Sequence, residues 1–266
     1  FIRAKLDAQG YGHVGIFAPF MEDLPGRNYE AALPLFMGLL AGDLIRFAPM
    51  EQRGTLLNAI FDTIGNGQFD MQALMSVAGT IDPKTESNRN GKRILVIGEP
   101  LIVFNDFLND YALHSMEKQG HRVIYAPLGE YIWMMWRDFI AQNRKTPLLE
   151  ERFKGMKNSI IRLSECIAEQ SPFESDPEDL IARADKTIGY YAGAFGRYRQ
   201  AKISGGLDRI DGIITVSSAY ENTGISLNIM RKEFETPGSK PVLNLTFDGN
   251  RNENDRTKIE SFLYYL

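Results

Sequence analysis

The stretch from Arg93 to Tyr125 constrains the fold of this 266-residue chain more than any other. Four consecutive apolar residues, Ile94–Ile97, have the pattern of a parallel strand that is buried on both faces. Apolar residues at helical spacing follow, and Gly120 stands where a glycine commonly ends a helix. A second apolar run then begins at Val123. Strand, helix and strand in this order form the unit from which doubly wound parallel sheets are built.

The rest of the C-terminal part continues this alternation of strands and helices. The sequence predicts four strands, at Arg93–Ile97, Arg122–Ala126, Gly212–Val216 and Pro241–Phe247. Between and after them it predicts helices over residues 106–119, 128–142, 150–170, 176–202, 224–235 and 255–266. We therefore predict an α/β, flavodoxin-like domain over residues 93–266: a parallel four-stranded sheet with helices on both faces and a long helical insert.

We predict that residues 1–81 form a smaller, mostly helical α/β domain, so that the chain would hold two Rossmann-like or flavodoxin-like domains. We expect a helix over residues 1–10, a strand at His13–Phe17, and helices over 28–48, 55–64 and 71–77. A helix that feeds a strand at the very start suggests a truncated domain, and hence a fragment of a larger protein. Residues 82–92 are polar and contain Pro and Gly, which is typical of a linker between domains.

Composition excludes several classes of protein. A net charge of −4 does not suggest a nucleic-acid or anionic-membrane binder, and no apolar run reaches transmembrane length. The single cysteine, Cys166, cannot form an internal disulfide, and with three histidines it cannot supply a cysteine-rich metal cage. We expect Cys166 to be a small buried helix residue, and a cytoplasmic location is the default expectation.

The candidate site residues follow the predicted strands, because the carboxyl ends of parallel strands meet at one edge of a sheet. After the first strand come Gly98, Glu99 and Pro100, where glycine would let a ligand approach the backbone or would simply end the strand. No G-x-G-x-x-G follows any strand, so the dinucleotide fingerprint is absent. Asn105 and Asn109 would share one helix face and could contact a ligand, although an N-cap role explains one of them equally well.

The second and third strands add further polar residues to the same edge. Glu130 and Tyr131 open the helix after the second strand, where Glu130 would favour the positive end of the helix dipole or pair with Glu99 across the crevice. Ser217, Ser218 and Asn222 follow the third strand and could bind a ligand or cap the next helix.

Four phrases of the sequence carry a family likeness. They are LLAGDLIRF, GEPLIVFNDFLND, APLGEYIWMMW and PVLNLTFDGNRNENDRTKIESFL. Together they resemble the large 2-hydroxyglutaryl-CoA dehydratase activator-related proteins, also called CoA-substrate-specific enzyme activases, and the region is similar to the dehydratase subunits themselves. The resemblance implies flavodoxin-like domains in a protein that handles acyl-CoA dehydration or its ATP-driven electron supply.

The resemblance also implies an iron–sulfur cluster held by cysteines in the dehydratases, for which this chain offers only Cys166. Where the family tends to place a cysteine after the third strand, the chain has Ala219-Tyr220-Glu221. We therefore expect an accessory, non-catalytic domain that binds an acyl-CoA, another small ligand, or a dehydratase or activase partner chain. Two alternatives stay open: a dehydratase-type subunit whose cluster ligands are completed by another chain, and an unrelated flavodoxin-like protein that binds a small ligand.

Overall fold

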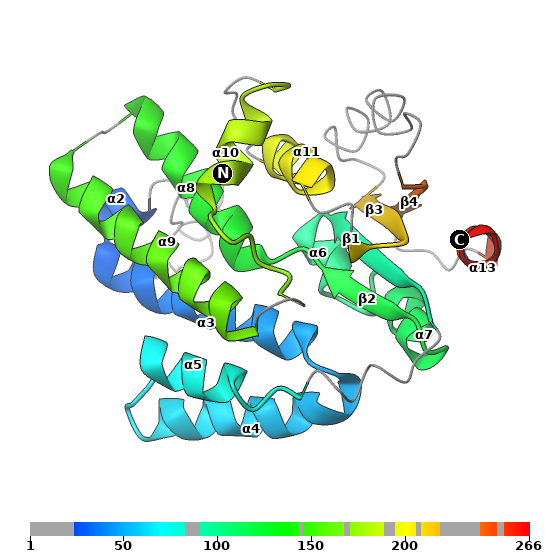
Figure 1. Cartoon of the computed structure of the whole chain (residues 1–266), viewed down its shortest axis with the longest axis horizontal. Coiled ribbons are helices and arrows are strands. Elements are labelled where there is room, and N and C mark those ends of the chain that lie inside the picture. Colours follow the sequence, from blue (N-terminus) through cyan, green and yellow to red (C-terminus); the bar gives the residue numbers. More distant parts are fainter. Residues whose placement is uncertain are drawn as a thin grey trace, which may run out of the picture.

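The computed structural model describes residues 24–82, 91–143, 146–167, 171–188, 195–205, 209–218, 240–248 and 253–266. Within these ranges, four strands form one sheet in the order β2-β1-β3-β4, and every neighbouring pair is parallel (Figure 1). The strands are β1 (Arg93–Gly98), β2 (Arg122–Tyr125), β3 (Gly212–Ser218) and β4 (Val242–Phe247). The predicted α/β class and the four predicted parallel strands are confirmed.

Both faces of the sheet are buried, as the continuous apolar run of β1 predicts. Ile94 and Val96 belong to one hydrophobic cluster, and Leu95 and Ile97 belong to another, because successive side chains of a strand point to opposite faces. Helices α6 (Pro100–Val103), α7 (Ala112–Lys118) and α13 (Glu253–Tyr265) contribute to the first cluster.

The second cluster is larger and contains most of the helices. It includes buried residues of α3 (Tyr29–Phe47), α4 (Met50–Gly65), α5 (Met71–Ala78), α8 (Leu128–Asn143), α9 (Pro147–Ile167), α10 (Glu178–Ala184) and α11 (Phe195–Gly205), with the short α2 (Leu24–Arg27) beside them. Figure 1 shows these helices gathered on one side of the sheet, with α4 and α5 at the lower edge of the view.

Helices from the expected N-terminal domain share this cluster with the sheet. Phe36 of α3 packs against Trp136 of α8, with 6.4 Å between the ring centroids. Arg53 of α4 forms an ion pair with Glu117 of α7, with 2.5 Å between Nη2 and Oε1. Residues on both sides of the 82–92 segment are thus packed together, while the division into two domains stays a prediction. The helix and strand expected within residues 1–23 and the helix expected over 224–235 lie outside the described residues.

Two predicted helices differ from the structure. The helix expected over residues 106–119 is helical only from Ala112, because Asp110 and Tyr111 have the left-handed φ values of 50° and 56°. Its end is as predicted, since Gly120 has a φ of 90° just beyond the last helical turn. The helix expected over residues 176–202 is divided into α10 and α11.

Candidate functional site

The carboxyl ends of β1 and β3 meet around Glu99. The Glu99 N–H donates to the Val216 carbonyl (2.9 Å), and the Ser218 N–H donates to the Glu99 carboxylate (3.1 Å). A Cβ on Gly98 would lie 2.0 Å from the Val216 oxygen, so glycine is needed for this close approach. This β1–β3 crevice is the topological switch point at which open α/β sheets commonly bind ligands, and here the chain's own carboxylate occupies part of it.

Hydroxyl groups continue this edge toward β4. The Ser217 hydroxyl lies 3.4 Å from the Thr246 hydroxyl, and both are exposed to solvent. The structure thus brings Gly98, Glu99, Ser217 and Ser218 together. Asn222 lies outside the described residues.

The two asparagines have structural roles in the described part of the chain. The Asn105 side chain accepts hydrogen bonds from the N–H groups of Phe107 (3.1 Å) and Leu108 (3.3 Å), which forms a local turn that competes with a helix. Asn109 is fully buried and donates to the Ile102 carbonyl (3.0 Å). The two amides therefore do not share a helix face, because residues 106–111 form turns. Pro100 is the first residue of the short helix α6.

Glu130 lies inside a buried network and not beside Glu99. Its carboxylate accepts from the Lys202 ammonium (2.8 Å), from the Tyr198 hydroxyl (3.2 Å) and from the Glu174 N–H. Burial raises the pKa of Glu130, and the nearby Lys202 ammonium opposes that rise. The proposed pairing of Glu130 with Glu99 is therefore wrong, because a cation from α11 neutralises the charge. Tyr131 packs its ring against Tyr198.

The buried Lys202 ammonium contacts three oxygen-bearing groups of the protein. Besides Glu130 it contacts the Pro172 carbonyl at 2.6 Å and the Glu174 carboxylate at 3.2 Å. Arg183 of α10 forms an ion pair with Glu174 at 2.9 Å. Two carboxylates and two cations therefore balance, and the network joins α8, α10 and α11 to the segment that holds Pro172 and Glu174.

The amino end of α8 is occupied by a carboxylate from α3. The two oxygens of Asp43 accept hydrogen bonds from the N–H groups of Leu128 (2.8 Å) and Gly129 (2.7 Å). Burial raises the pKa of Asp43 to about 8, although these two hydrogen bonds lower it. In α/β sheets a helix start of this kind often holds an anionic ligand, and here the carboxyl group of Asp43 takes that place.

A pocket of about 320 Å³ lies beside this carboxylate. It is formed by one side of α3, the end of α6 and the start of α8, and its lining is Gly38, Leu39, Gly42, Asp43, Ile45, Arg46, Phe104 and Leu128. We call it the α3 pocket. Phe104 follows β1 and α6, and Leu128 comes shortly after β2, so the pocket lies at the predicted carboxyl edge of the sheet. No atom lies within 4 Å of a Cβ added at Gly38 or Gly42, which leaves this side of α3 open.

Arg46 gives the α3 pocket its cation. Its guanidinium lies over the rings of Phe104 and Tyr125, at 5.9 and 5.2 Å from their centroids, and donates to the Phe104 carbonyl (3.3 Å). Asp106 is 3.8 Å away, a longer ion-pair contact. An arginine has five N–H donors, and these contacts within the described part of the chain use only some of them. Arg46 can therefore donate to an oxygen of a ligand.

Comparisons with known proteins identify no relative: no family model, no curated protein and no solved structure matches the chain. Among the described residues, no group of three or more His, Cys, Asp or Glu side chains is arranged to hold a metal ion. Within the same ranges, every helix is too short or too polar to span a bilayer.

The site residues predicted from the sequence were expected at the carboxyl edge of the sheet, and none of those that the structure describes lines the α3 pocket. Gly42, Asp43 and Arg46 all lie in the LLAGDLIRF phrase, which contributed to the family resemblance but suggested no site. Two glycines four residues apart inside an apolar helix, Gly38 and Gly42, were the available signal. Such spacing places both on one helix face, where the missing side chains leave room.

Proposed function

We propose that this chain is a non-catalytic, ligand-binding α/β unit of the activase type, and that its ligand occupies the α3 pocket. The observation that carries the proposal is the pocket itself, whose volume of about 320 Å³ falls at the lower end of the range for small-molecule sites. The empty space beside Gly38 and Gly42 on α3 also supports the proposal. Glycine in a helix costs about 1 kcal/mol relative to alanine, so two glycines facing a pocket suggest that the space has a use.

The lining favours a ligand with a short apolar body and an oxygen acceptor. Leu39, Ile45, Leu128 and the Phe104 ring would surround the apolar part, and the remaining N–H donors of Arg46 would bind a carboxylate or a carbonyl oxygen. Short-chain acyl compounds have this chemistry, either as free carboxylates or as thioesters of CoA. The resemblance to CoA-substrate-specific activases independently favours the thioester form.

The proposal is tested by titrating the protein with butyrate, hexanoate, octanoate, butyryl-CoA and CoA alone, using isothermal calorimetry. The variant Gly42→Leu fills the pocket from α3, and we expect it to abolish binding without loss of stability. Gly155→Leu on α9 is the matched control, because Gly155 is also a helical glycine with no atom near its added Cβ, and this variant should bind normally.

The role of Arg46 is tested separately, because its guanidinium is proposed to bind the carboxylate or carbonyl oxygen of the ligand. Arg46→Met keeps a long side chain against the two rings and removes the charged donors, so we expect carboxylate affinity to fall about tenfold or more. If none of the compounds binds, or if Gly42→Leu binds as well as the unaltered protein, the proposal is wrong.

A further inference from the structure

The outer face of α4 carries a row of exposed apolar side chains. Leu57, Phe61 and Ile64 are 39%, 58% and 48% exposed. At 100° per residue they fall within an arc of about 60° around the helix axis. The buried residues Leu56 and Ile60 pack on the core from a neighbouring part of the same helix. We call the exposed row the α4 stripe.

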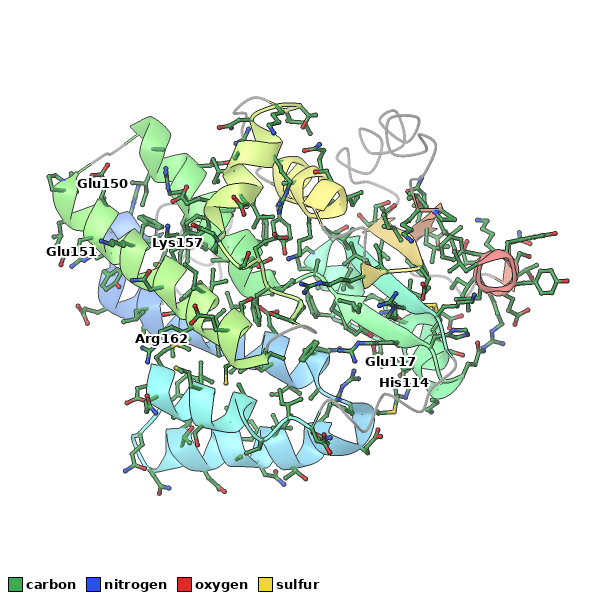
Figure 2. The ribbon with its side chains drawn as sticks, in the orientation of Figure 1. His114, Glu117, Glu150, Glu151, Lys157 and Arg162 are labelled. Atoms are coloured by element: carbon green, nitrogen blue, oxygen red, sulfur yellow. The ribbon has the colours of Figure 1, made fainter. Side chains whose placement is uncertain are left out.

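The part of the α4 surface that lies beside the α4 stripe, on the side away from the core, is acidic. Glu51 and Asp62 are exposed there. Among residues 50–82, all of which the structure describes, the only cation is Arg53, and it is turned inward. Its guanidinium binds both oxygens of Glu117, at 2.9 and 2.5 Å, and Figure 2 labels Glu117 on α7.

The exposed face of α9 differs in its charge pattern. It presents Glu150, Glu151 and Arg162, with the half-buried Lys157 at its edge, so that charges of both signs are present along the helix (Figure 2). Beside its three large apolar side chains, α4 instead exposes the carboxylates of Glu51 and Asp62, while its cation Arg53 is turned inward. Partners with positive charge complement such a surface, whereas a second acidic surface is repelled.

We propose that the α4 stripe is a docking surface for an amphipathic helix of a partner protein, whose apolar side is flanked by Lys and Arg. Positions i, i+4 and i+7 of one helix form the contact row that helix-recognition interfaces use. A second copy of this chain is a poor occupant, because two-fold pairing of α4 would bring acidic edges together. The proposal is independent of the α3 pocket and of any ligand in it.

The test uses two fluorescent synthetic helical peptides, one with Leu on one face and Lys on the other, and one with Glu in place of each Lys. We expect the Leu/Lys peptide to bind in fluorescence anisotropy and the Leu/Glu peptide not to bind. The double variant Phe61→Ser/Ile64→Ser should lower the affinity about tenfold or more. Leu148→Ser on α9 removes another exposed apolar side chain and should have no effect.

Charge is tested with Asp62→Lys, which should weaken binding of the Leu/Lys peptide and improve binding of the Leu/Glu peptide. Circular dichroism checks that each variant is folded, which we expect because the changed side chains are exposed. Equal affinity for both peptides, or unchanged affinity in the double variant, would overturn the proposal. So would a dimer in sedimentation that the double variant dissociates, because a second copy would then occupy the stripe.

Discussion

A buried tyrosine hydroxyl stabilises a fold only when it has a hydrogen-bond partner, and two tyrosines of this chain differ in that respect. The Tyr198 hydroxyl donates to the Pro127 carbonyl (2.8 Å) and also contacts the Glu130 carboxylate (3.2 Å). The Tyr125 hydroxyl is buried without a hydrogen-bond partner among the described residues. We expect Tyr198→Phe to lower the free energy of unfolding by about 1.5–3 kcal/mol.

Tyr125→Phe is the matched control for that change. It should leave the free energy of unfolding unchanged or raise it slightly, because burying an unpaired hydroxyl is unfavourable. Urea unfolding of the two variants measures both values. A larger loss from Tyr125→Phe than from Tyr198→Phe would contradict the hydrogen-bond assignments.

Asp43 predicts a pH dependence of stability with a definite sign. Its pKa is about 8 in the folded chain against an ordinary value of 3.8, so the folded state holds the proton over a range in which the unfolded state has lost it. Folding therefore takes up a proton between about pH 4 and pH 8, and this residue's contribution to stability falls as the pH rises through that window.

The variant Asp43→Asn has no proton to exchange, so its stability should fall less between pH 5 and pH 8 than that of the unaltered protein. Asp62→Asn changes an exposed carboxylate and should leave the slope as it was. The free energy of unfolding from urea titrations at several pH values measures both. An unchanged slope in Asp43→Asn would show that Asp43 is already ionised at pH 5.

At the scale of elements, the charge network around Lys202 holds the helices of the larger cluster in register. The variant Lys202→Met removes the cation and leaves the Glu130 carboxylate buried without its counter-charge. Such a loss lowers the free energy of unfolding by about 3–5 kcal/mol. Lys258→Met removes a half-exposed partner of Asp255 on α13 and should cost less than about 1 kcal/mol. Thermal and urea unfolding compare the two variants. Similar losses of stability in both variants would mean that the buried network contributes no more to stability than a surface ion pair.

Elements were easier to predict from the sequence than the contacts between them. β1, β2 and β3 were predictable because each contains a run of apolar residues, and β1 is buried on both faces. In β4, which reads VLNLTF, polar residues interrupt the apolar ones, but the segment still contains four large apolar side chains. The interruption before α7 was not predictable from the sequence. It depends on the left-handed backbone of Asp110 and Tyr111, and neither residue is a glycine, the residue type that usually adopts this conformation. The role of Glu130 was equally hidden, since its partner Lys202 comes from a helix 72 residues further along the chain.

At the scale of the whole molecule, helices on both sides of the 82–92 segment share one hydrophobic cluster. Trp133 and Trp136 lie at its centre and are almost completely buried, so tryptophan fluorescence reports on this packing. We expect the fluorescence and far-ultraviolet circular dichroism transitions to coincide on heating, as they do for one cooperative unit. Two separate transitions would instead show that residues 24–82 unfold independently.

The location of bound ligand tests the central claim of this account most directly. In ¹⁵N-labelled protein titrated with octanoate or butyryl-CoA, the amide resonances of Gly38, Gly42 and Leu128 should shift at saturation, because these residues line the α3 pocket. Those of Gly54 and Gly155, which lie elsewhere on helices, should not shift. Shifts confined to the β1–β3 crevice at Glu99 and Ser218, with none at Gly42, would contradict the account.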